Sequence, residues 1–131
     1  MSSTQRIIDD AERYVRELAT DLLRPNPGEC LCCYVARQLG EFSCNGTHRH
    51  AFAYRDAVAP RATALRERLA RVGAHCCDCE LFENAYAPAD RRLREQEQGW
   101  APSELPPCAG VRRGSTRPCA NWVRVRWHPL R

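Results

Sequence analysis

Nine cysteines in a chain of 131 residues limit what this sequence can fold into more than any other feature. They gather in two clusters, within residues 30–50 and 75–80, and a further pair, Cys108 and Cys119, lies downstream. No apolar run follows Met1 and no stretch is long enough for a membrane span, so we expect a cytoplasmic protein whose thiols stay reduced. An odd number of reduced, clustered cysteines favours metal binding or redox chemistry over a disulfide framework.

The clusters contain two pairs with the spacing of metal ligands. Cys30 and Cys33 lie one helical turn apart at the start of a predicted helix, where the positive helix end favours thiolates. Cys77 and Cys79 are separated by one residue, which puts both side chains on one side of an extended segment. Zinc prefers four tetrahedral thiolate or imidazole ligands. The first prediction is therefore one zinc site formed by both pairs.

Other ligand sets stay open. Cys44 is a substitute or fifth ligand, and His48 lies four residues later, so these two form an alternative pair. The same thiolates also suit an iron–sulfur cluster, which is the alternative to zinc. Cys32 and Cys76 are expected to be local extras, and free cysteines also occur simply as small buried apolar residues.

The apolar pattern predicts a mainly α fold, a small domain of about four helices stapled by the metal site. The helices are expected at residues 4–24, at 30–42, from Thr47 to about Val58, and from Pro60 to Val72. The chain divides into an N-terminal packing helix (1–27), a cysteine-rich helical domain (28–86), a linker (87–107) and a basic tail (108–131) of irregular or short β structure.

The C-terminal region carries most of the positive charge, with six arginines and one glutamate in residues 101–131. Cys108 and Cys119, with His128 or a core thiolate, are candidates for a second metal or thiol site. Arginine binds phosphate and aromatic rings stack on bases, so a nucleic-acid partner is one hypothesis and an acidic protein is another. Packing of the indoles on the domain as an edge strand is the simpler interpretation. The residues concerned are Arg112, Arg113, Arg124, Arg126, Trp122 and Trp127.

The order of the motifs also indicates a family. Glu29-Cys30-Leu31-x-Cys33-Tyr34 is followed by Cys44-x-Gly46-Thr47, by Pro60-Arg61 and by Cys77-Asp78-Cys79-Glu80 with Asn84. In this pattern, residues 28–86 resemble a family of short actinobacterial proteins known only as a domain of unknown function. The resemblance implies that Cys30, Cys33, Cys44, Cys77 and Cys79 matter together, and it carries no activity.

No catalytic motif of a hydrolase, metalloprotease or dinucleotide-binding enzyme is present, and the sequence favours a protein without catalysis. We expect a small zinc-binding protein with a binding or regulatory role. The alternative from another class is a thiol or iron–sulfur redox protein or sensor that uses Cys30 and Cys33.

Overall fold

The computed structural model describes residues 2–125, and its regular structure is mainly helical. The α-helices are α1 (Ser3–Leu23), α2 (Leu31–Phe42), α3 (Arg49–Val58), α4 (Leu65–Arg71) and α5 (Arg91–Arg94). A π-helical turn η1 (Leu81–Ala85) follows α4, and a 3-10 turn η2 (Pro102–Glu104) follows α5. Strands β1 (Tyr86–Pro88) and β2 (Trp122–Arg124) pair antiparallel, with Ala87 opposite Val123. The predicted fold class, helical with a short-β C-terminal extension, is confirmed.

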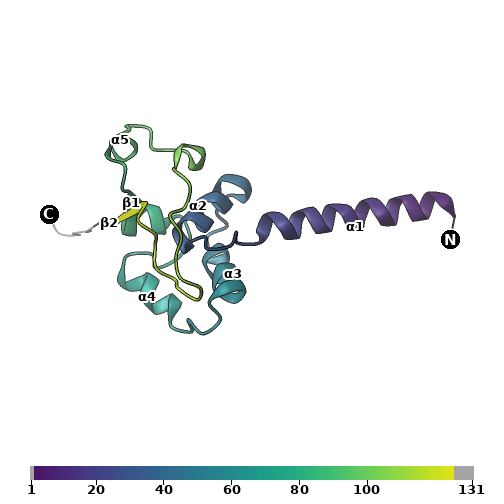
Figure 1. Ribbon diagram of the computed structural model, residues 1–131, viewed down its shortest axis with the longest axis horizontal. Helices are drawn as coiled ribbons and strands as arrows, with labels where there is room; N and C mark the ends of the chain where they lie inside the picture. The colour runs from purple at the N-terminus through teal and green to yellow at the C-terminus, as the bar shows by residue number, and fades with distance from the viewer. Residues whose placement is uncertain (1, 126–131) are drawn as a thin grey trace.

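Helix α2 lies at the centre of the core (Figure 1). Its Tyr34 and Val35 are fully buried, and the ring of Tyr34 packs on Tyr54 of α3 at 5.6 Å between centroids. Leu65 and Leu69 of α4 close the same core, together with residues of η1. Burying a side chain of this size contributes roughly 1.5–3 kcal/mol, so each of these residues adds appreciably to the stability of the core.

Helix α1 extends away from the rest of the molecule (Figure 1). It contains no buried residue, and its apolar stripe is solvent-exposed, with Ile7 69% and Leu18 44% accessible. The sequence predicted a packing helix here, but no other described part of the chain covers this stripe. Only the last carbonyls of α1 are held, since Gln38 and Arg37 donate hydrogen bonds to Leu22 O.

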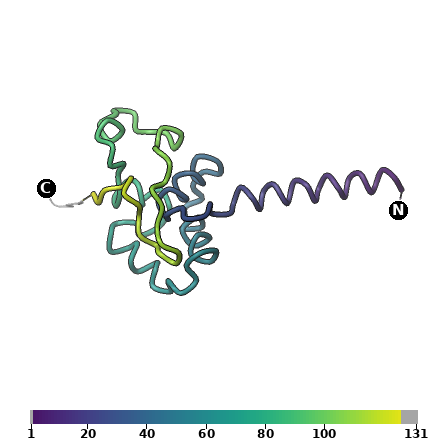
Figure 2. Tube along the Cα trace, in the orientation of Figure 1, coloured from purple at the N-terminus to yellow at the C-terminus, as the bar shows by residue number. Residues whose placement is uncertain are grey.

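The C-terminal segment, from residue 108 onward, packs across the start of α2 (Figure 2). The N–H of Val111 donates to Gly28 O, and the N–H of Cys30 donates to Cys108 Sγ at 3.3 Å. Trp122 of β2 is 6% exposed. The expectation that an indole of this segment packs on the domain therefore matches the structure for Trp122, whereas Trp127 lies outside the described residues.

Helix α3 starts later than predicted and is capped from a distance. Thr47 was expected to cap it, but the N-cap residue is His48 and its side chain makes no capping hydrogen bond. The buried carboxylate of Asp78 takes that role, accepting the N–H groups of His50 at 2.9 Å and Ala51 at 3.1 Å. This contact fastens the second cysteine cluster to the start of α3.

Candidate metal centre

Four cysteines from distant parts of the chain converge at the N-terminus of α2. The sulfurs of Cys30, Cys33, Cys108 and Cys119 all lie within 4.8 Å of one another. Cys30 is the N-cap residue of α2 and Cys33 lies in its first turn, while the other two come from the loop before β2. None of these cysteines is in a disulfide, so the group is positioned to hold a metal ion.

Every sulfur of this quartet accepts a hydrogen bond from an N–H group. Cys30 Sγ accepts from Cys33 N, Cys119 Sγ from Asn121 N, and Cys108 Sγ from both Cys30 N and Gly110 N, at 3.3–3.4 Å. Cys33 Sγ accepts from the indole Nε1 of Trp122 at 3.3 Å. Donors aimed at sulfur stabilise thiolate and orient it for a metal, whereas neutral thiols need few such partners.

The electrostatics of the pair on α2 point the same way. The Cys33 side chain hydrogen-bonds to Cys30, and this contact lowers the pKa of the Cys30 thiol to about 5 against the opposing effect of burial. The same contact, with burial, raises the pKa of Cys33. A metal cation bound by both sulfurs would favour the thiolate form of each and displace their protons.

Aromatic rings cover one side of the quartet and leave the other side open. Phe82, Trp100 and Trp122 pack together, with centroid distances of 5.1–5.5 Å. A surface cavity of about 490 Å³ is lined in part by Cys33 and Cys108. Of the four, Cys33 and Cys108 are partly exposed residues, whereas Cys30 and Cys119 are buried.

The second cysteine cluster lies elsewhere. Cys77 and Cys79 are not part of the quartet. They lie beside the turn that carries Cys44 after α2, because the N–H of Asp78 between them donates to Thr47 O. Helix α2 has 12 residues, so its two ends are about 18 Å apart. The ligand set predicted first, Cys30 and Cys33 with Cys77 and Cys79, differs from this arrangement because one ion cannot reach both ends of the helix.

Other candidate residues have different surroundings. His48 is buried, and its Nε2 lies 3.0 Å from Ala74 O, which occupies that nitrogen. Cys32 is buried in the core, where desolvation raises its pKa, and Cys76 is exposed. His128 and Arg126 lie outside the described residues.

The basic tail does not form a single line of charge. Arg112 and Arg113 line a groove of about 720 Å³ together with Arg61, Arg68 and Arg117. Arg124 lies apart on β2, where its guanidinium stacks over the Tyr86 ring. The burial of Trp122 leaves its ring no face for a nucleic-acid base.

Sequence reasoning placed Cys108 and Cys119 in a possible separate site and missed their pairing with Cys30 and Cys33. One signal was present: Cys44-Asn45-Gly46 and Cys108-Ala109-Gly110 share a Cys-x-Gly pattern. It also missed the cap supplied by Asp78 and the indole donor of Trp122. Those contacts join residues 27 or more positions apart, which no local pattern reveals.

Comparison with known families gives one result. Residues 31–84 match the family described as Protein of unknown function (DUF2695). This confirms the resemblance of the middle of the chain to an uncharacterised family. The DUF2695 segment contains Cys33 of the quartet, whereas Cys108 and Cys119 lie beyond it.

No curated protein and no solved structure gives a significant match to the chain. Between residues 2 and 125, no helix is both long and apolar enough to cross a membrane.

Proposed function

We propose that this protein is a small zinc-binding module in which one Zn²⁺, held by Cys30, Cys33, Cys108 and Cys119, has a structural role. The observation that carries the proposal is the quartet itself, four sulfurs within 4.8 Å of one another, each with an N–H donor. Zinc sites with four thiolates leave no position for substrate and are typical of structural centres.

The spacing of the sulfurs favours a single ion over an iron–sulfur cluster. Four ligands at the Zn–S distance of about 2.3 Å form a tetrahedron whose edges are about 3.8 Å long. Cys33 Sγ and Cys119 Sγ are already 3.8 Å apart. A cluster places its ligands around a cage of several atoms, which needs wider separations than this quartet offers.

The test is the metal content of protein purified without a histidine tag and under exclusion of air. We expect zinc, no colour, and loss of about one equivalent in Cys119→Ser. The matched control is Cys32→Ala, which removes a buried thiol on the same helix and should retain that equivalent. Iron with brown absorption would replace this proposal with the redox alternative, and unaltered zinc content in Cys119→Ser would refute the ligand set.

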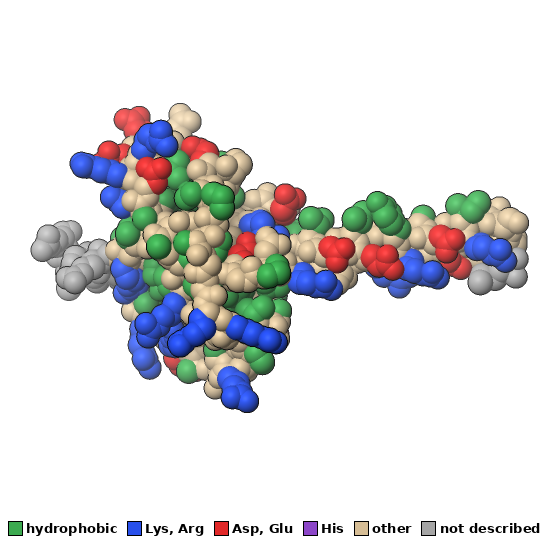
Figure 3. All heavy atoms as spheres, viewed as in Figure 1, with side chains coloured by type: hydrophobic (Ala, Val, Ile, Leu, Met, Phe, Trp, Pro, Cys, Tyr) green, Lys and Arg blue, Asp and Glu red, His purple; other side chains and the backbone are tan. Residues whose placement is uncertain are grey.

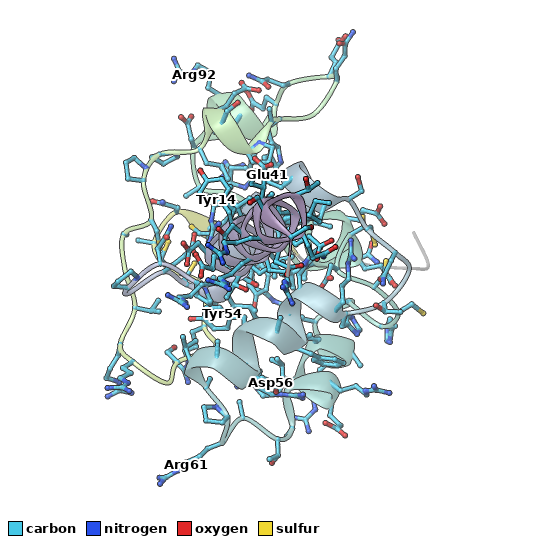
Figure 4. The ribbon with its side chains drawn as sticks, turned by 90° about the vertical axis from the view of Figure 1, so that its right-hand side faces the viewer. Tyr14, Glu41, Tyr54, Asp56, Arg61 and Arg92 are labelled. Atoms are coloured by element: carbon cyan, nitrogen blue, oxygen red, sulfur yellow. The ribbon has the colours of Figure 1, made fainter. Side chains whose placement is uncertain are left out.

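A second candidate function rests on the groove lined by Arg61, Arg68, Arg112, Arg113 and Arg117. None of these five pairs with a carboxylate among residues 2–125, and the lining contains no acidic side chain. Figure 3 shows basic side chains gathered over this part of the body, and Figure 4 shows Arg61 pointing away from it. Unpaired guanidinium groups around a hollow favour a polyanion, and we propose nucleic acid, bound through its phosphates.

Salt dependence tests this second function. Binding of a labelled oligonucleotide should weaken with salt, with a log–log slope of roughly one per phosphate contacted. Replacing Arg112, Arg113 and Arg117 together with alanine should flatten that slope, whereas the control Arg91→Ala/Arg92→Ala on α5 should not. Binding that is absent, or insensitive to the groove variant, would exclude the nucleic-acid partner and leave an acidic protein as the occupant.

A further inference from the structure

The cysteine quartet and the basic groove share one stretch of the chain. Residues 108–119, which we call the ligand loop, begin at Cys108 and end at Cys119, two of the four proposed zinc ligands. Between these cysteines, residues 112–117 line the groove. Arg112 lies four positions after the first ligand and Arg117 two positions before the second. Whatever fixes the two cysteines therefore also fixes both ends of this wall of the groove.

The rest of the groove lining belongs to a different part of the fold. It consists of Arg61 and Ala62, in the turns before α4, and of Arg68 in α4. One contact joins the two walls directly, since Arg68 Nη1 donates to Thr116 Oγ1 at 2.7 Å and Thr116 is 7% exposed. The groove therefore exists only while the ligand loop lies beside α4.

Within residues 2–125, the ligand loop has few polar contacts with the body apart from those of its two cysteines. The loop contains no helix or strand. Three hydrogen bonds without a sulfur partner join it to earlier parts of the chain: Val111 N donates to Gly28 O, Tyr54 Oη donates to Ser115 O, and Arg68 donates to the loop as described above. Because such bonds replace bonds to water, each contributes only modestly to the free energy of folding.

Positive charge opposes this position of the loop. Its three arginines lie around the same hollow as the two arginines of the α4 wall, and none of the five pairs with a carboxylate among the described residues. Like charges repel one another, and ordering an irregular loop costs conformational entropy. An ion that ties both ends of the loop to Cys30 and Cys33 would oppose both effects.

We infer that metal occupancy of the quartet controls the groove, because zinc holds the ligand loop beside α4 and so sets the affinity for nucleic acid. The inference rests on both parts of the proposed function, the zinc centre and the nucleic-acid groove. Zinc makes no contact with the nucleic acid here. It holds the arginines in the arrangement that the phosphates bind, so that less binding energy is spent on ordering the loop. Since linkage is reciprocal, bound nucleic acid strengthens zinc binding by the same factor.

The affinity of zinc-loaded and metal-free protein for an oligonucleotide tests this coupling. Full-length protein is kept anaerobic, and binding of a labelled single-stranded oligonucleotide is followed by fluorescence anisotropy at one salt concentration, with zinc and after its removal by a chelator. We expect affinity to be about tenfold weaker without zinc. The helical circular dichroism signal should persist without zinc. Loss of that signal would show unfolding of the whole domain and would overturn control through the loop.

The reciprocal measurement needs no variant. Competition with a chromophoric chelator gives the zinc affinity, which should rise about tenfold with saturating oligonucleotide. An unchanged zinc affinity would contradict the coupling. Among variants, Cys119→Ser should bind the oligonucleotide as weakly as metal-free protein even with zinc added. The matched control Cys76→Ser, which changes an exposed thiol outside the quartet, should bind like the wild type.

The coupling and the two proposed functions fail in different ways. If zinc-loaded protein does not bind the oligonucleotide, the nucleic-acid function fails and the coupling fails with it. If Cys119→Ser retains its full zinc content, the proposed zinc centre fails first. If loaded and metal-free protein bind the oligonucleotide equally, the coupling alone is overturned.

Discussion

At the scale of single residues, Trp122 shows how a side chain 89 positions from its partner thiol completes the candidate metal centre. Its indole N–H is the donor to Cys33 Sγ, and its ring packs on Phe82 and Trp100. An indole carries one donor and no acceptor, so it can stabilise a thiolate without competing for the metal. The sequence suggested that Trp122 could stack on nucleic-acid bases, but in the structure its buried ring packs beside the cysteine quartet.

Trp122→Phe separates these two roles of the indole. The variant keeps an aromatic ring against Phe82 but removes the N–H donor to Cys33. Loss of an outer hydrogen bond to a ligand typically weakens metal binding 10- to 100-fold, and we expect about tenfold here. Competition with a chelator of known affinity measures it. The control is Trp100→Phe in the same aromatic group, and an equal loss of affinity in that variant would assign the effect to packing.

Asp78 is the second residue with an effect larger than its size suggests. A buried carboxylate that accepts two backbone N–H groups stabilises the start of α3, and Asp78→Asn replaces one acceptor oxygen with a donor. We expect a loss of about 2 kcal/mol in the free energy of unfolding, measured by urea denaturation. Asp90→Asn, which changes the exposed N-cap of α5, should cost less than half as much. Equal effects would show that burial of Asp78 adds nothing.

At the scale of elements, the helices that the sequence predicts well are those defined by local signals. The predicted bounds of α1 and α2 agree with the structure to within a residue, because a cap residue, an apolar stripe and following proline or turn residues mark both ends. Helix α4 is shorter than predicted, since residues 59–64 form turns before Leu65. Gly73, which follows the C-cap residue Val72, has φ +105°, a conformation that glycine adopts readily after a helix end.

The features that could not be predicted depend on long-range contacts. The cap of α3 comes from Asp78, and the ligands at α2 come from beyond residue 107. A Cys-x-x-Cys pair supplies two of the four ligands of a tetrahedral metal site, but it does not indicate which later thiols supply the other two. With nine cysteines, the choice of partners is set by the path of the chain, which short-range spacing does not encode.

Helix α1 permits a direct comparison of an exposed and a buried leucine. Leu18→Ser on α1 should change the melting of the domain little, within about 0.5 kcal/mol, because Leu18 is 44% exposed and contacts no core. Leu65→Ala in α4 should cost about 2–5 kcal/mol, because Leu65 is 1% exposed. Both are read from thermal unfolding followed at the tryptophans. A large effect of Leu18→Ser would show that the apolar stripe of α1 is covered in solution.

At the scale of the whole molecule, the quartet joins the two ends of the folded body. Cys30 and Cys108 are 78 positions apart, and Cys33 and Cys119 are 86 apart. The only strand pairing in the described part of the chain, β1 with β2, lies close to the same junction. An ion bound by the quartet would therefore hold the C-terminal segment on α2, where little regular structure does so.

Metal removal should release that segment first. With excess chelator, we expect trypsin to cleave at Arg112 and Arg113 at least tenfold faster than in the zinc-loaded protein, because local opening governs cleavage. Cleavage at Arg13 and Arg16 on the exposed helix α1 provides the internal control and should not depend on metal. Equal rates at Arg112 with and without zinc would show that the quartet does not fasten the segment.

The separation of the ligands along the chain also sets an order of events during synthesis. Ribosomes add about 5–20 residues per second, so Cys119 follows Cys33 by roughly 4–17 s over the 86 intervening positions. Until Cys108 and Cys119 have been made, Cys30 and Cys33 lack the other two sulfurs of the quartet. Metal captured then would be held by two sulfurs and lost easily, so stable loading must wait until the loop before β2 has been made. Zinc would in this way distinguish a finished polypeptide from an interrupted one.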